Sequence, residues 1–220
     1  LAAQTRAAAG DLASAEQLLR RAIDADSTLL PAYAMLAQLY LSQKKLDQAR
    51  QEFDAMAAKQ SRPVAALTMS GMILQSQGQT AEARKRFEQA LAIDATAPVA
   101  ANNLAWIQAE AGEQLDVALQ LAQRAASRSP DVAEITDTVG WIYLKKNQPH
   151  LAVPQFERSV ALDSKNATFH YHLGLAYLQA GDAVRGRASL ERALAAGPDP
   201  KTEAEIKQAL SRQAGFPSRN

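Results

Sequence analysis

Residues 64–97 read VAALTMSGMILQSQGQTAEARKRFEQALAIDATA, and this stretch of 34 residues decides the fold. In its first half, Leu67, Gly71 and Leu74 lie four and three residues apart, which places them on one face of a helix. Gly78 follows as a helix stop, because glycine tolerates the left-handed conformation that ends many helices. The first half therefore predicts one amphipathic helix and the turn after it.

The second half of the stretch repeats this pattern after the turn. Ala83, Phe87 and Ala90 are again four and three residues apart. We therefore expect two antiparallel helices over residues 64–77 and 80–93, packed on each other through these faces.

The same pattern recurs along the whole chain with a nearly constant period. The turn-forming residues, spaced by 34, 34, 34, 35 and 34, are Gly10, Lys44, Gly78, Gly112, Asn147 and Gly181. Small residues of the second helix recur in step at Ala15, Ala49, Ala83, Ala118, Ala152 and Gly186. Bulky residues of the second helix recur at Leu19, Phe53, Phe87, Phe156 and Leu190, with Ala122 as the exception. Small residues of the first helix recur at Ala37, Gly71, Ala105, Gly140 and Gly174. A fixed period in this range indicates stacked helix pairs that bury their apolar faces against their neighbours, and hence an all-α fold.

These columns resemble the tetratricopeptide repeat (TPR) family, as the series Gly174, Tyr177, Gly181, Ala193 and Pro198 illustrates. The resemblance covers nearly the whole chain and implies a right-handed TPR superhelix, an α-solenoid of antiparallel helix pairs. It divides the chain into a half repeat at 1–29, repeats at 30–63, 64–97, 98–132, 133–166 and 167–200, and a C-terminal capping helix at 201–213. Since the chain begins inside the first helix of a repeat, we expect the natural protein to extend upstream.

Two places depart from the family pattern. The repeat at 98–132 has one extra residue in its turn, and Gln108 and Ala122 replace bulky residues, so we expect a looser or re-angled stack there. In the following repeat, Pro149 and Pro154 lie near the start of the second helix. Because Pro154 removes a backbone hydrogen bond, this helix is expected to start late or to kink.

The composition excludes several classes of function. Lysine and arginine number 24 and aspartate and glutamate 23, a formal charge of +1, which argues against nucleic acid or a membrane surface as partner. With no cysteine, disulfides and cysteine-based zinc sites are impossible, and the compartment stays open. No apolar run approaches the roughly 18 residues that a membrane-spanning helix needs, so no direct membrane insertion is expected.

The sequence offers no residues for catalysis. Its three histidines are His150, His170 and His172, and the last two lie on different faces of a helix, so they cannot chelate one metal ion. Neither a phosphate-binding glycine-rich loop nor a nucleophile elbow is present. We therefore expect a protein that is not an enzyme and that needs no metal and no cofactor.

The TPR resemblance implies that the first helix of each pair lines a concave groove, and it carries the groove positions over by their place in the repeat. The predicted peptide-binding residues are Met69, Met72, Asn102, Asn103, Trp106, Glu110, Asp137, Thr138, Trp141, Lys145, Tyr171 and His172. Both tryptophans of the chain are among them, 35 residues apart. Aromatic side chains dominate binding hot spots, and amides hold extended chains, so these residues suit a peptide. Trp106 and Trp141 could equally fill the gap between adjacent first helices.

A narrower resemblance lies in three phrases, NNLAW (102–106), DTVGWIYLKK (137–146) and YHLGLAYLQAGD (171–182). They are similar to phrases in large bacterial TPR proteins associated with exopolysaccharide export and protein sorting, which implies a periplasmic or envelope-associated protein of a Gram-negative bacterium. The sequence thus predicts a non-catalytic scaffold, a monomer or weak homo-oligomer, that binds a protein or peptide segment in its groove. The alternative is a structural spacer or oligomerisation module of an envelope assembly.

Overall fold

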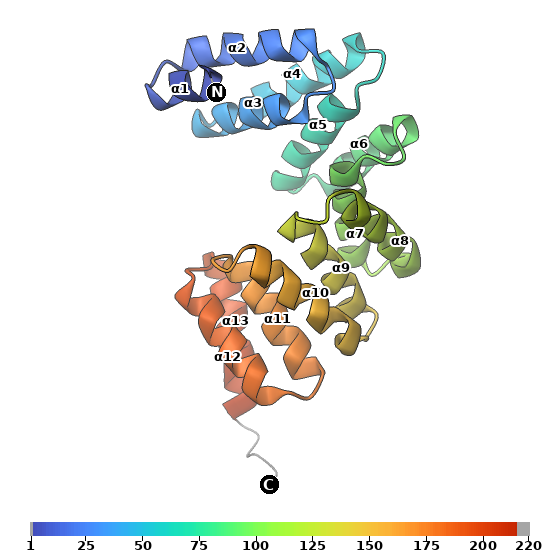
Figure 1. The fold of residues 1–220 in the computed structure, drawn as a ribbon, viewed down its shortest axis with the longest axis vertical. Coiled ribbons are helices and arrows are strands. Elements are labelled where there is room, and N and C mark those ends of the chain that lie inside the picture. Colours follow the sequence, from blue (N-terminus) through green and yellow to red (C-terminus); the bar gives the residue numbers. More distant parts are fainter. Residues whose placement is uncertain (1, 215–220) are drawn as a thin grey trace. The chain divides into compact units, whose positions relative to one another are not determined.

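The computed structural model describes residues 2–214, and within that range it consists of thirteen α-helices and no strands (Figure 1). The helices are α1 (Ala2–Ala8), α2 (Leu12–Ala25), α3 (Leu30–Ser42), α4 (Leu46–Lys59), α5 (Val64–Ser76), α6 (Thr80–Ile93), α7 (Pro98–Ala111), α8 (Leu115–Arg128), α9 (Ala133–Lys145), α10 (Pro149–Leu162), α11 (Ala167–Gln179), α12 (Ala183–Ala195) and α13 (Pro200–Ala214). The all-α prediction is confirmed, and the two helices expected at 64–77 and 80–93 are α5 and α6.

The turns inside the helix pairs have one backbone conformation. All six predicted turn residues have a positive φ, between 57° and 87°. The residue after the turn closes it, as when the Gln79 N–H donates to the Leu74 carbonyl five residues earlier (2.9 Å), the bond of a Schellman motif. Glycine suits this conformation, whereas Lys44 and Asn147 adopt it against the ordinary preference of residues with a Cβ.

The two departures from the repeat pattern have simple local solutions. In the longer turn before α8, Gln114 adopts a second left-handed conformation, with φ of 46°, and directly precedes the helix. The helix α10 begins at Pro149, so the expected late start is wrong. Proline suits the first turn of a helix because its φ is already helical and its missing N–H would have no partner there. The helix continues through Pro154.

The chain forms two compact units, Leu1–Ile107 and Gln108–Asn220, which divide near the end of α7. Within the units, helices pack mainly on their neighbours in the chain, as α5 does on α4 and α6, and α9 does on α8 and α10. In addition, α3 contacts α5 and α9 contacts α11, so the first helices of adjacent pairs also touch. These contacts leave one face of the first helices to carry the candidate site. The predicted division into individual repeats stays a prediction.

Contact between glycine and an aromatic ring sets the spacing inside the pairs. A Cβ built on Gly71 would lie 2.7 Å from Cε1 of Phe87, and one on Gly140 would lie 2.8 Å from Cε1 of Phe156. Both phenylalanines are fully buried. The recurring small residue of the first helix therefore packs directly against the recurring bulky residue of the second helix.

Tyrosines near the end of the first helices link them to the second helix of the preceding pair. The Tyr40 hydroxyl donates to Glu16 (2.9 Å) and accepts from Arg20 (2.7 Å), the latter twenty residues earlier. At the same separation, Tyr143 accepts from Nε2 of Gln123 (3.0 Å), and Tyr177 donates to a carboxylate, that of Glu157. These polar contacts join neighbouring pairs at the edge of the apolar seam.

The helix α13 packs on α12, in the place where the sequence predicts a capping helix. Ile206 is fully buried and clusters with Leu190 and Ala193 of α12. The outer face of α13 is mostly exposed. This arrangement suits a cap, because it covers the apolar face of α12 and turns a polar face outward.

We expect Phe87→Ala to lower the free energy of unfolding by about 3–5 kcal/mol, because it empties the space between α5 and α6. Urea unfolding followed by circular dichroism measures the change. The control is Leu41→Ala, since Leu41 is largely exposed and should change stability by less than about 0.5 kcal/mol. Equal effects of the two substitutions would contradict the assigned packing.

Gly140→Leu should be at least as damaging, with a loss of at least about 3 kcal/mol, because its side chain would overlap the ring of Phe156. Combining it with Phe156→Ala removes the obstacle, so the losses should be less than additive by at least about 1 kcal/mol. Thermal and urea unfolding of the single and double variants test this coupling. Strict additivity would show that the two residues do not meet.

Candidate interaction surface

The predicted groove residues all lie on first helices, and each compact unit holds part of the set. In the first unit, α5 carries Met69 and Met72, and α7 carries Asn102, Asn103 and Trp106. In the second unit, the end of α7 carries Glu110, α9 carries Asp137, Thr138, Trp141 and Lys145, and α11 carries Tyr171 and His172.

Burial separates these residues into two groups. Met69, Asp137, Thr138 and His172 are only 5%, 4%, 3% and 4% exposed, so they offer little surface to a partner. The half-buried members are Asn102, Asn103, Trp106, Trp141 and Tyr171, and the exposed members are Met72, Glu110 and Lys145. Only the second group therefore offers surface for direct contact with a partner.

A buried acid–base pair connects α9 and α11. The Nδ1 atom of His172 lies 2.8 Å and 3.0 Å from the two carboxylate oxygens of Asp137. Burial raises the pKa of Asp137 above its ordinary value, an effect that the neighbouring His172 opposes and that Glu134 reinforces. The pair thus places a titratable group inside the helix stack.

Trp141 lies directly against His172 of this pair and is also held by two other side chains, those of Glu110 and Lys145. Its ring stacks on the His172 ring, with centroids 4.4 Å apart and planes at 30°. Its Nε1–H donates to Oε1 of Glu110 (2.7 Å). The Lys145 ammonium lies 4.9 Å from the indole centroid and 3.3 Å from Glu110. Trp141 therefore bridges adjacent first helices and also keeps part of its surface exposed, which combines the two alternatives from the sequence.

Tyr171 and Phe156 complete the surroundings of His172. Their ring centroids lie 5.7 Å and 5.6 Å from that of His172. The Tyr171 hydroxyl donates to Glu205 of α13 (3.2 Å), and burial together with this carboxylate raises the pKa of Tyr171 to about 12. Tyr171 consequently stays a neutral donor at physiological pH.

The predicted polar contacts with a peptide are partly used within the helices. Asn103 Nδ2 donates to the carbonyl of Val99 (2.8 Å), and the hydroxyl of Thr138 donates to that of Glu134 (2.9 Å). By contrast, Oδ1 of Asn102 is buried without a hydrogen-bond partner among the described residues. Asn102 is thus the amide in this set with an unused acceptor.

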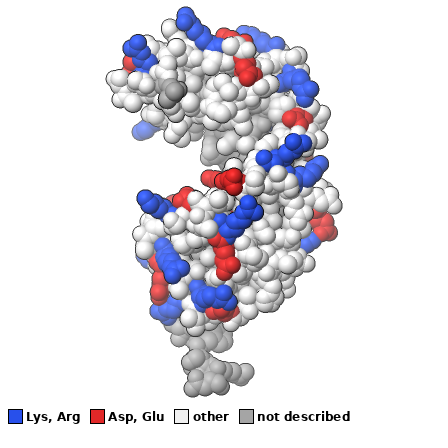
Figure 2. All heavy atoms as spheres, viewed as in Figure 1, with Lys and Arg blue, Asp and Glu red and all other residues white. Residues whose placement is uncertain are grey.

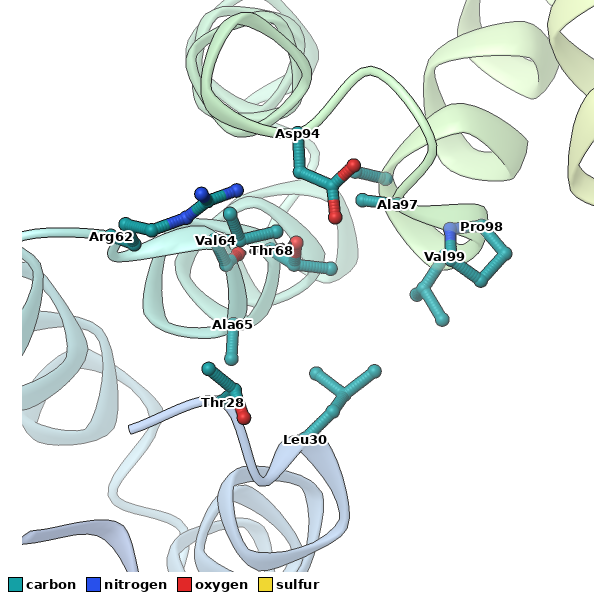
Figure 3. Close-up of a pocket in the computed structure, with 11 residues that line it drawn as sticks. Thr28, Leu30, Arg62, Val64, Ala65, Thr68, Asp94, Ala97, Pro98 and Val99 are labelled. Atoms are coloured by element: carbon teal, nitrogen blue, oxygen red, sulfur yellow. Dashed lines mark hydrogen bonds between the residues drawn. The ribbon is translucent and has the colours of Figure 1, made fainter. Parts of the chain in front are cut away.

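The first unit contains a pocket of about 380 Å³ at the N-terminal ends of α3, α5 and α7 (Figure 3). Figure 3 shows Leu30, Ala65 and Val99, one from each helix, around the same space, with Arg62 and Asp94 along one edge. No motif of the sequence predicts this pocket. Its signal is the series of small residues Ala65, Ala97 and Ala100, which leave a space between larger neighbours.

Charges on the surface are mixed in sign. Figure 2 shows acidic and basic side chains interspersed on the visible face of each unit, without a broad field of either sign. Across residues 2–214, no group of three or more histidine, aspartate or glutamate side chains is arranged to hold a metal ion. In the same part of the chain, no helix combines the length and apolarity required to traverse a bilayer.

Comparison with family sequence models identifies the repeats. A model described as tetratricopeptide repeat matches residues 68–133 and 140–199, and a second model with the same description matches residues 6–68. The comparison with curated protein sequences finds no match.

Solved structures share the fold at low sequence identity. The APC/C heterotetramer Cut9–Hcn1 is 18% identical with a TM-score of 0.74, and the match covers 94% of this chain but only 40% of that one. YrrB, described as a TPR protein with an unusual peptide-binding site, is 21% identical over 86% of this chain and 97% of its own, with a TM-score of 0.58. TTC0263 of Thermus thermophilus, described as a thermophilic TPR protein, is 15% identical over 85% of this chain and 100% of its own, with a TM-score of 0.63. At these identities the likeness concerns the fold alone.

Proposed function

The chain belongs to the tetratricopeptide repeat family, and we propose that it is a non-catalytic scaffold that binds a segment of a partner protein on the exposed face of its first helices. Members of this family generally bind protein or peptide partners. The observation that carries the proposal is Trp141, an aromatic side chain that is half-exposed on this face and held in one orientation by His172, Glu110 and Lys145.

A fixed aromatic side chain is a favourable binding anchor. Ordering a mobile side chain at an interface costs about 0.5–1.5 kcal/mol, and Trp141 loses little of this freedom because its neighbours already hold it. Tryptophan is also among the residues most enriched in binding hot spots. The partner is therefore expected to place an apolar side chain against the exposed part of Trp141.

The first unit carries a candidate binding pocket of its own. A volume of about 380 Å³, lined mainly by apolar side chains, is large enough for a leucine, methionine or phenylalanine side chain. YrrB, a TPR protein with an unusual peptide-binding site, shares this fold and supports peptide binding as the general mode. We thus expect an extended or helical segment with a few apolar anchors.

The alternative function, a structural spacer or oligomerisation module, draws on another surface. Val117, Leu151 and Val184 lie at the beginnings of α8, α10 and α12 and are exposed, Val184 to 82%. Self-association through these second helices would leave Trp141 uninvolved. Light scattering of the protein and of Val184→Asp separates the alternatives, because only the oligomerisation module would change its mass.

We expect Trp141→Ala to weaken binding at least about tenfold while the helical circular dichroism and most of the melting temperature are retained. Trp106→Ala is expected to do the same. Peptides selected from a random library on the parent protein provide the probe, and calorimetry measures their affinity, expected near the micromolar range or about −8 kcal/mol. The matched control is Leu151→Ala, an exposed residue on α10, which is the second helix of its pair. Variants that bind normally but melt early would assign both tryptophans to the core.

Binding should depend only weakly on salt, because the charges beside Trp141 are already paired with each other. Between low ionic strength and about 0.15 M, the dissociation constant of a selected peptide should change by less than about threefold. The same calorimetric titration at several salt concentrations measures this. A loss of affinity of about a hundredfold would instead indicate recognition dominated by cations.

A further inference from the structure

The buried pair of Asp137 and His172 needs an explanation beyond stability. Both side chains are nearly inaccessible, so neither can contact a partner directly. Removing charged or polar groups from water is costly, and a buried pair is often no better for stability than apolar residues of the same size. The location of the pair is informative, because it lies immediately behind the one aromatic side chain that carries the proposed function.

We propose that Asp137 and His172 are positioning residues, which hold the ring of Trp141 on the binding face and make its environment respond to protonation of His172. This inference rests on the proposed function for its binding consequence, although its spectroscopic consequence does not require a partner. The chemistry involved is the uptake of one proton on the imidazole and no covalent step.

The geometry shows how the pair would act. The Asp137 carboxylate accepts from Nδ1–H of His172 and thereby fixes both the tautomer and the plane of the ring. This plane is the surface on which Trp141 stacks at 4.4 Å. At the other side of the indole, Glu110 holds Nε1. Two carboxylates on different helices, α7 and α9, thus define the orientation of one tryptophan.

Protonation would change the contact without breaking it. An imidazolium stacked on indole interacts with the π face as a cation, which strengthens the stack. The groups that face this site are Glu110 from α7, Glu134 and Lys145 from α9, and Tyr171 with Glu205 from α11 and α13. The neighbour from α10, Phe156, is uncharged, and Arg185 of α12 lies instead over Tyr177. Carboxylates outnumber ammonium groups here, so an imidazolium would be neutralised locally.

The chain offers a direct optical test, since it has only two tryptophans. In Trp106→Phe, the remaining indole is Trp141, and an imidazolium in contact with it quenches its fluorescence. We expect the emission to fall in one step as the pH is lowered. The step should be absent in Trp141→Phe. If Trp106→Phe does not fold, subtracting the emission of Trp141→Phe from that of the unmodified protein gives the emission of Trp141. A flat titration of Trp141 would overturn the proposal.

Further variants identify the titrating group. His172→Gln should abolish the step, whereas His150→Gln should leave it unchanged, because His150 is exposed and on α10. Asp137→Asn removes the carboxylate that would stabilise the imidazolium, so the step should move to lower pH. Persistence of the step in a folded His172→Gln variant would contradict the assignment. Circular dichroism establishes that each variant is folded.

The binding consequence is measured separately. With a selected peptide whose affinity is lost in Trp141→Ala, the folded Asp137→Asn variant should bind at least about threefold more weakly at neutral pH, because the anchor is less well held. Unchanged affinity would overturn the positioning role. If no peptide depends on Trp141, the proposed function fails while the optical result still decides whether the pair controls the ring.

Discussion

The fit of a glycine against an aromatic ring is the constraint on which the rest of this fold depends. Gly71 against Phe87 and Gly140 against Phe156 bring the two helices of a pair so close that a methyl group on either glycine would overlap the ring. This contact fixes the orientation of each first helix. It therefore also fixes which face of that helix packs on the next pair and which face remains for a partner. The position of Trp141 follows from Gly140, the residue directly before it.

Much of the fold could be predicted because its determinants are local and periodic. Glycine marks four of the six turns, and Lys44 and Asn147, which lack the freedom of glycine, adopt the same conformation at the other two, where the period predicts a turn. The boundary between the two compact units lies at Ile107 and Gln108, inside the repeat at 98–132, whose departures from the family pattern are visible in the sequence. A late start or a kink was expected for α10 because Pro154 removes a backbone hydrogen bond, but the helix begins at Pro149 and continues through Pro154.

The helices that carry the candidate residues could be predicted from the sequence, whereas the burial of each residue could not. The period alone places Asp137, Trp141 and His172 on first helices at related positions, and the structure brings them together. The repeat period does not reveal that Asp137 and His172 are buried behind Trp141, because a small rotation of a helix about its axis decides which side chain is covered. The pocket beside Ala65 was missed for a related reason. It is formed where small side chains of three helices leave a space, and small side chains scattered along a sequence give no recognisable pattern.

The contacts between neighbouring pairs all join residues that are close in the chain. Arg20 reaches Glu52 and Arg86 reaches Asp54, in each case over 32 residues, and His172 reaches Asp137 over 35. A segment leaving the ribosome can therefore complete its tertiary contacts as soon as the following helix pair has been synthesised, without waiting for the end of the chain. The same locality of contacts makes unfolding under mechanical tension stepwise. Force applied at one end opens one pair at a time, so the molecule can lengthen in steps and recover them while its remaining repeats stay folded.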